Sequence, residues 1–88
     1  MVNELDQFAA DGGGLLVVGH GTRLPDGQQQ LLDLAAAMQQ QCQRLPIEPC
    51  FLELAEPDIR EGLLRLKNRD VRRVIVVPIL LFTAAHAK

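Results

Sequence analysis

Two adjacent features, an apolar run and a turn with two glycines, decide the fold in the stretch Leu15-Leu16-Val17-Val18-Gly19-His20-Gly21-Thr22-Arg23. Four apolar residues in a row between glycines are typical of a strand covered on both faces, as in a parallel sheet. The glycines at 19 and 21 then suit a tight turn at the carboxyl end of that strand. Because position 24 is leucine and no lysine follows Gly21, the turn is neither a dinucleotide-binding fingerprint nor a Walker-type phosphate loop.

The rest of the chain alternates amphipathic and apolar segments. Apolar side chains spaced by three and four predict a helix over 28–44, which Pro46 ends. A second strand is expected over 47–54, and Pro57 fits the first turn of a second helix that stops at 68–70. A third strand is expected at 74–77, continuing toward 81 with weaker pairing at Pro78. We expect the second helix to bury a stripe formed by Ile59, Leu63 and Leu66.

Apolar strands alternating with helices indicate the α/β class, with a parallel sheet flanked by helices and right-handed crossovers. In the common strand order 2-1-3 the first strand lies at the centre. Three consecutive glycines at 12–14 predict a flexible lead-in, so residues 1–13 are expected to form a tail, with at most a short helical turn. Residues 14–88 are expected to form one domain.

Composition excludes several classes of function. The 88 residues include 9 basic and 11 acidic side chains and no Trp or Tyr, which argues against a nucleic-acid partner. The longest apolar run, 74–82, is far shorter than the roughly 20 residues that span a bilayer, and no signal-peptide pattern opens the chain. We therefore expect a cytoplasmic protein without a membrane partner, whose Cys42 and Cys50 are reduced and match no metal spacing.

A metal-capable side chain stands at or beyond the carboxyl end of each expected strand: His20, Glu53 and His86. Glu53 comes 33 positions after His20, and His86 comes 33 positions after Glu53, one strand-helix-strand period each. Ligands bind at this end of an open parallel sheet, and neighbouring strands lie about 4.8 Å apart, so the three side chains can reach one ion. Two imidazoles and a carboxylate suit cobalt, iron, nickel or zinc, with an open position left for transfer. Taken singly, each histidine is more often a surface or capped residue than a ligand, and Glu53 can be a solvated charge at the end of its strand.

Three motifs resemble the small sirohydrochlorin cobaltochelatases and ferrochelatases of the CbiX and SirB type, over roughly residues 14–88. The first is Leu16-Val17-Val18-Gly19-His20-Gly21-Thr22-Arg23 and the second is Phe51-Leu52-Glu53-Leu54-Ala55-Glu56-Pro57. The third is Val77-Pro78-Ile79-Leu80-Leu81-Phe82-Thr83-Ala84-Ala85-His86-Ala87-Lys88.

The resemblance implies a class II chelatase fold and insertion of a divalent metal into sirohydrochlorin, on the route to cobalamin or sirohaem. It implies that His20, Glu53 and His86 hold the metal, with His20 and Glu53 also catalytic. Arg23 and Lys88 are weaker candidates for contacts with substrate carboxylates. It implies Co²⁺ as the substrate metal, alternatively Fe²⁺ or Ni²⁺, and no other cofactor.

The family continues past the third motif with a helix and a strand, which we expect to be missing from this chain. Activity is then expected to need a homo-oligomer or a complementing C-terminal segment. The alternative function is a non-catalytic metal-binding or assembly fragment of the same fold. A histidine phosphatase is disfavoured because that class needs Arg directly before the histidine, where this chain has Gly19.

Overall fold

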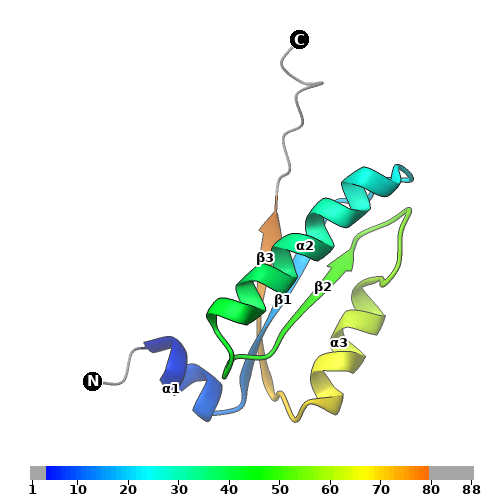
Figure 1. Cartoon of the computed structure of the whole chain (residues 1–88). Helices are drawn as coiled ribbons and strands as arrows, with labels where there is room; N and C mark the ends of the chain where they lie inside the picture. Colours follow the sequence, from blue (N-terminus) through cyan, green and yellow to red (C-terminus); the bar gives the residue numbers. More distant parts are fainter. Residues whose placement is uncertain (1–3, 80–88) are drawn as a thin grey trace.

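The computed structural model of the chain describes residues 4–79, which form a three-stranded parallel sheet with helices on both faces (Figure 1). The strand order is β2-β1-β3, as the sequence predicts, and the α/β class is confirmed. The elements follow one another as α1 (Glu4–Ala10), β1 (Gly13–Gly19), α2 (Pro25–Gln41), β2 (Ile47–Phe51), α3 (Ile59–Asn68) and β3 (Arg73–Ile79).

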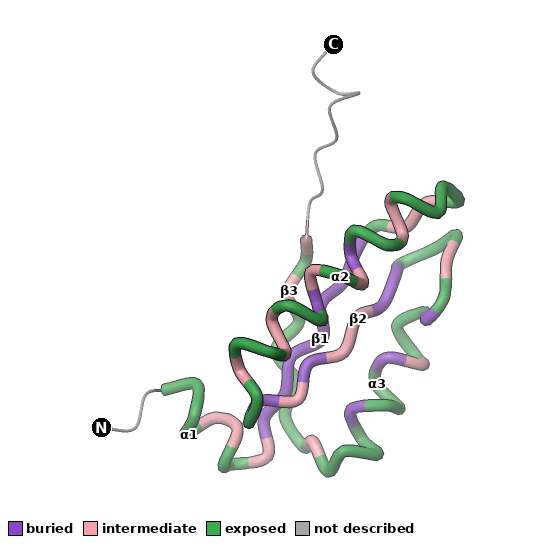
Figure 2. Tube along the Cα trace, in the orientation of Figure 1, coloured by how far each residue is buried: buried purple, intermediate pink, exposed green. Residues whose placement is uncertain are grey.

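The central strand β1 carries the core, because all seven of its residues are buried. Leu15 and Val17 point to the face covered by α2, where they pack with Leu31 and Phe51. Leu16 and Val18 point to the opposite face, which α3 covers. An apolar run without alternation is therefore required in this strand, since both of its faces are covered (Figure 2).

Both outer strands contain a proline, in positions that an edge strand tolerates. Pro49 of β2 pairs with Val17, and Pro78 of β3 pairs with Val18. Regular pairing therefore continues through Pro78 to Ile79, without the weakening that the sequence predicts at Pro78. On the other side, β2 ends at Phe51, three residues before the expected position, because the chain turns there into a loop.

The N-terminal segment is more ordered than a flexible tail. Residues 4–10 form α1, and Gly13 and Gly14 belong to β1 rather than to a linker. Phe8 explains the difference, since its ring packs against the core cluster and a side chain at Gly13 would overlap that ring. Gly13 therefore serves to let the Phe8 ring pack closely against the strand, and these glycines do not form a flexible linker.

Helix α2 begins at Pro25, three residues earlier than predicted, and ends at Gln41. The predicted face is confirmed in its central part, where Leu31 and Ala35 are buried. None of the helices within residues 4–79 is long and apolar enough to cross a membrane.

Helix α3 is rotated relative to the expected stripe. Asp58 caps the helix by accepting a hydrogen bond of 2.9 Å from the Glu61 amide. Gly62 and Leu66 are buried, whereas Ile59 and Leu63 are 36% and 41% exposed. The glycine decides the rotation, because it lets α3 lie close to β1 and β2; a Cβ at position 62 would come within 2.7 Å of Leu16 Cδ1.

Candidate metal-handling site

The carboxyl ends of β1 and β2 bring two of the three predicted site residues together. His20 follows β1 directly, and its Nε2 lies 3.2 Å from Oε2 of Glu53, in the loop after β2. Both side chains are open to solvent, with exposed fractions of 73% and 59%. A small molecule or an ion can therefore reach the pair without any rearrangement of the chain.

Backbone hydrogen bonds continue the pairing of β1 with β2 beyond the regular strands. The Leu52 amide donates to the Gly19 carbonyl across 2.9 Å, and the Glu53 amide donates to the His20 carbonyl across 3.2 Å. The two site residues are thus joined through their backbones as well as through their side chains. Their relative position is set by the sheet rather than by two independent loops.

Each of the two turns is also fixed on its outer side. The Phe51 amide donates to the Pro57 carbonyl across 2.8 Å, which closes the loop that contains Glu53. On the histidine side, Nε2 of Gln28 donates to the Thr22 carbonyl across 2.8 Å. The Leu24 amide donates to the Thr22 hydroxyl across 3.1 Å, which anchors the turn to the start of α2.

The separation of His20 Nε2 and Glu53 Oε2 suits two chemical states. At 3.2 Å the imidazole N–H can donate directly to the carboxylate. Alternatively, two ligand atoms that share one ion through bonds of about 2.1 Å lie about 3.0 Å apart at an octahedral edge and about 3.4 Å apart at a tetrahedral one. The observed distance falls between these values, so it is compatible with a shared ion as well as with a direct hydrogen bond.

The remaining predicted site residues are not brought to this pair within the described part of the chain. His86 and Lys88 lie outside residues 4–79. Arg23 is exposed in the turn between His20 and α2. Over residues 4–79 no group of three or more His, Cys, Asp or Glu side chains is assembled, so the described site is a pair.

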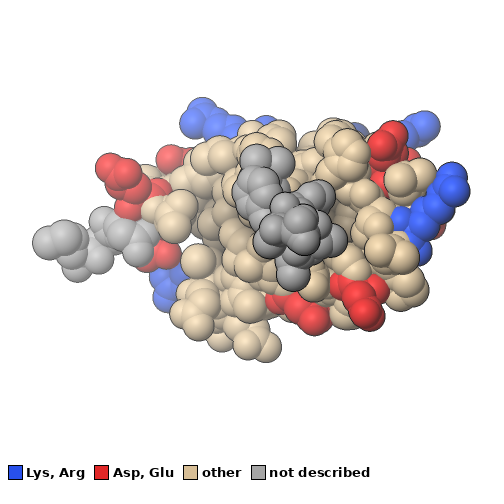
Figure 3. All heavy atoms as spheres, turned by 90° about the horizontal axis from the view of Figure 1, so that it is seen from above, with Lys and Arg blue, Asp and Glu red and all other residues tan. Residues whose placement is uncertain are grey.

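Uncharged surface surrounds much of this end of the molecule. Seen from above, acidic and basic side chains both stand at the border of this face, with mainly uncharged side chains between them (Figure 3). Three leucines in the loops at the carboxyl ends of β1 and β2 are strongly exposed: Leu24 at 70%, Leu52 at 55% and Leu54 at 48%. Sequence periodicity could not find them, because they lie in loops.

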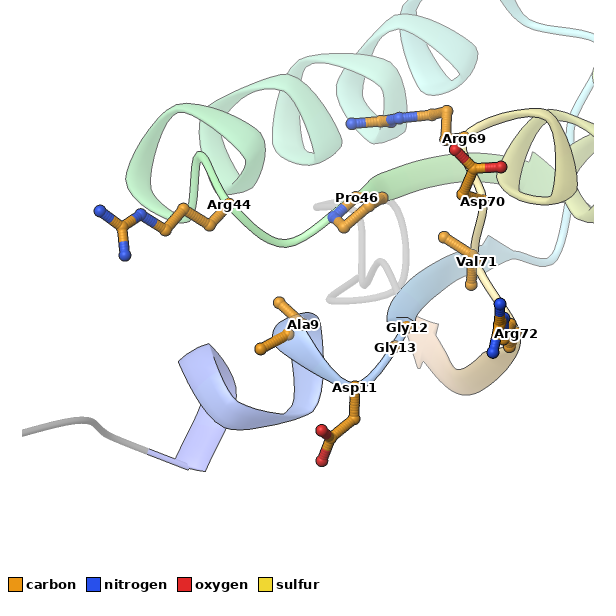
Figure 4. Close-up of a pocket in the computed structure, with 11 residues that line it drawn as sticks. Ala9, Asp11, Gly12, Gly13, Arg44, Pro46, Arg69, Asp70, Val71 and Arg72 are labelled. Atoms are coloured by element: carbon orange, nitrogen blue, oxygen red, sulfur yellow. The ribbon is translucent and has the colours of Figure 1, made fainter.

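A hollow of about 550 Å³ lies at the opposite end of the sheet, where the strands begin (Figure 4). Its charged lining residues are Asp11, Arg44, Arg69, Asp70 and Arg72. Arg69 is already engaged, since it donates to the Glu48 carboxylate across 2.8 Å and to Gln39 Oε1 across 3.0 Å. In Figure 4 the side chains of Arg44 and Asp11 extend in different directions. Open parallel sheets bind ligands at the other end, so the His20–Glu53 pair remains the candidate site.

A family model described as CbiX matches residues 14–88, which include both turns of the site. The chain belongs to the CbiX family. This finding confirms the resemblance carried by the three sequence motifs.

Relatives of this CbiX chain include enzymes named for two different metals. It is 42% identical over 92 residues to a sirohydrochlorin ferrochelatase of Priestia megaterium, covering all of this chain and 32% of that protein. It is 33% identical over 75 residues to a sirohydrochlorin cobaltochelatase of Methanothermobacter thermautotrophicus, and the match covers 85% of this chain and 52% of that protein. The chain thus spans between about a third and a half of the length of these relatives.

The crystal structure of the sirohydrochlorin chelatase SirB from Bacillus subtilis subspecies spizizenii, in complex with cobalt, has the same fold. The two structures superpose with a TM-score of 0.61 at 40% sequence identity. The match covers 86% of this CbiX chain and 32% of the SirB chain. The expected chelatase-like fold is therefore confirmed.

Proposed function

We propose that this chain carries the metal-handling part of a sirohydrochlorin chelatase, which inserts a divalent metal into a tetrapyrrole. The observation that carries the proposal is the 3.2 Å approach of His20 Nε2 to Glu53 Oε2 at the carboxyl ends of two parallel strands. Membership of the CbiX family supports it. The proposed metal is cobalt, with iron as the alternative, in cobalamin or sirohaem biosynthesis respectively.

The reaction sets clear demands on the site. A free-base macrocycle carries two N–H protons in its centre, and both leave as one M²⁺ enters and four nitrogen–metal bonds form. The protein must therefore present the ion, accept protons and release the product. A neutral imidazole is a suitable proton acceptor near pH 7, and an open site allows the ion to leave.

The observed contact suggests how His20 and Glu53 divide these tasks. When Nε2–H of His20 donates to Glu53, the lone pair of the neutral ring resides on Nδ1. Nδ1 is then free to bind the metal or to take a proton from the macrocycle. The carboxylate orients the ring and stabilises the imidazolium that forms, as carboxylates do beside metal-binding histidines. We assign His20 as the principal base and ligand, and Glu53 as its partner that helps to bind the ion and to move protons to solvent.

The surroundings of the pair match a flat macrocycle with a charged periphery. The exposed leucines at positions 24, 52 and 54 offer apolar surface to the ring system. Arg23, which is exposed three positions after His20, is proposed to contact substrate carboxylates, and Lys88 is proposed for the same role. His86 is proposed as a further ligand to the ion.

The test is to incubate the protein anaerobically with sirohydrochlorin and Co²⁺, Fe²⁺ or Ni²⁺ separately, and to follow the change in the absorption spectrum. We expect insertion with Co²⁺ or Fe²⁺ above the rate without protein, and a loss of that rate in His20→Ala. Binding of the ion with no insertion of any metal would instead support the non-catalytic metal-binding fragment.

A further inference from the structure

The turn that carries His20 contains a residue whose backbone lies against the backbone of Glu53. Gly21 has φ +112°, in a region that L side chains rarely adopt. A Cβ at this position would overlap the carbonyl oxygen of Glu53 and lie 2.8 Å from its carbonyl carbon. The obstacle is backbone, so no side-chain rotation can relieve it.

This close approach coincides with the two backbone hydrogen bonds that join the turns. The amides of Leu52 and Glu53 bond the carbonyls of Gly19 and His20, immediately before Gly21. A side chain at position 21 must therefore push the Glu53 backbone away from the His20 turn. Because Glu53 Oε2 reaches His20 Nε2 across only 3.2 Å, a shift of 1 Å is enough to break that contact.

We infer that Gly21 is a positioning residue, which holds the imidazole of His20 and the carboxylate of Glu53 in direct contact with each other. It acts through these two residues and contacts neither substrate nor metal itself. The inference rests on the proposed function for its kinetic consequence, but its structural consequence stands independently.

Two other glycines of the same chain provide matched controls. Gly12 also has a positive φ, +90°, but a Cβ there would meet Arg72 only at an ordinary contact distance of 3.5 Å, at the opposite end of the sheet. Gly19 is in the same motif as Gly21, and a Cβ there would meet the flexible end of Leu31 at 2.8 Å. Gly12→Ala thus tests backbone strain alone, and Gly19→Ala tests a tight contact near the site without displacement of Glu53.

The experiment compares Gly21→Ala, Gly12→Ala and Gly19→Ala by three measurements. Urea unfolding reports stability, nuclear Overhauser contacts between the His20 ring and the Glu53 side chain report their proximity, and metal insertion into sirohydrochlorin reports activity. In Gly21→Ala we expect the contact to be lost and the insertion rate to fall about a hundredfold, since a misplacement of about 1 Å has costs of this order. In Gly12→Ala and Gly19→Ala we expect the stability to fall, while the His20–Glu53 contact and the rate of metal insertion stay as in the wild type.

A second variant covers the case in which Gly21→Ala does not fold. Leu54 has φ +67° and is 48% exposed, so Leu54→Gly relieves backbone strain beside Glu53 with little loss of packing. The double variant Gly21→Ala/Leu54→Gly allows the Glu53 carbonyl to retreat, and we expect it to fold without the His20–Glu53 contact, while Leu54→Gly alone keeps that contact.

The outcomes separate the two proposals. Retention of the His20–Glu53 contact in Gly21→Ala or in the double variant overturns the inference, as does an equal loss of the contact in Gly12→Ala. If the wild-type protein inserts no metal but the contact disappears only on substitution of Gly21, the proposed function fails and the positioning role stands.

Discussion

The amide of Glu53 donates a hydrogen bond to the carbonyl oxygen of His20 across 3.2 Å, and the carboxylate of the same glutamate lies 3.2 Å from the imidazole. The first contact involves only backbone atoms and survives any substitution that leaves the chain path intact. The second depends on the side chains. Substitution of either side chain therefore tests the chemistry of the pair with the loops still held in place.

Replacing Glu53 by glutamine is expected to slow metal insertion about tenfold to a hundredfold, the usual effect of losing a carboxylate partner of a metal-binding histidine. Stability should change by no more than about 0.5 kcal/mol because the side chain is exposed. Glu56→Gln is the matched control, since Glu56 is exposed in the same loop. Insertion rates and urea unfolding of both variants give the comparison, and a slower Glu56→Gln enzyme would reverse the assignment.

His20 and His86 are predicted to bind one divalent ion together. The prediction derives from the order of the sequence, because His20 follows β1 and His86 follows β3, the strand that pairs with β1. Titration with Co²⁺, followed by calorimetry or by the visible spectrum of the bound ion, should show an affinity reduced at least about tenfold in each His→Ala variant. Unchanged affinity in both variants would rule out a shared site.

The two cysteines should differ in their effect on alkaline stability. Burial, with a smaller contribution from the Asp58 carboxylate, raises the pKa of the Cys50 thiol from 9.0 to about 11. Because the folded state holds this proton more tightly than the unfolded chain, the stabilisation is complete below pH 9 and is lost as the pH rises toward 11.

The measurement is urea unfolding under reducing conditions at several pH values between 8 and 11. We expect the free energy of unfolding of the wild type to fall more steeply over this range than that of Cys50→Ala. Cys42→Ala serves as the control, because Cys42 is only partly buried. Parallel curves for the wild type and Cys50→Ala would contradict the prediction.

Strand β3 is predicted to mediate self-association of the 88-residue chain. It is an outer strand, and Val74, Ile75 and Val76 are 36%, 47% and 57% exposed. Apolar surface on an edge strand favours pairing with another chain. Specific insertion activity should accordingly rise with protein concentration, or on addition of a segment that covers this surface.

Sedimentation velocity of Val76→Lys should show weaker association than the wild type. Leu64→Lys is the control, because Leu64 is similarly exposed, at 48%, but lies on α3. A wild-type monomer with full activity at every concentration would refute the prediction.

The sequence by itself determined the three strands, the two helices between them and their order. The run at 15–18 is apolar without alternation because β1 is covered on both faces, and this local pattern is readable without coordinates. The placement of His20 and Glu53 at the same end of the sheet followed from the parallel arrangement, since the carboxyl ends of parallel strands share one edge. These predictions depend on local pattern and on general topology, which one sequence contains.

Only the tertiary structure decided the features that depend on contacts between distant residues. Helix α3 buries Gly62 in place of the expected Ile59 and Leu63, because a glycine allows the helix to approach Leu16 and Cys50. The glycines at 13 and 14 became part of β1 because Phe8 folds back over Gly13. The sequence accounts for Gly21 by a tight turn alone, whereas the structure shows that the carbonyl of Glu53 lies against it. In each case the space available to a side chain is set by residues elsewhere in the sequence, which periodicity and composition do not record.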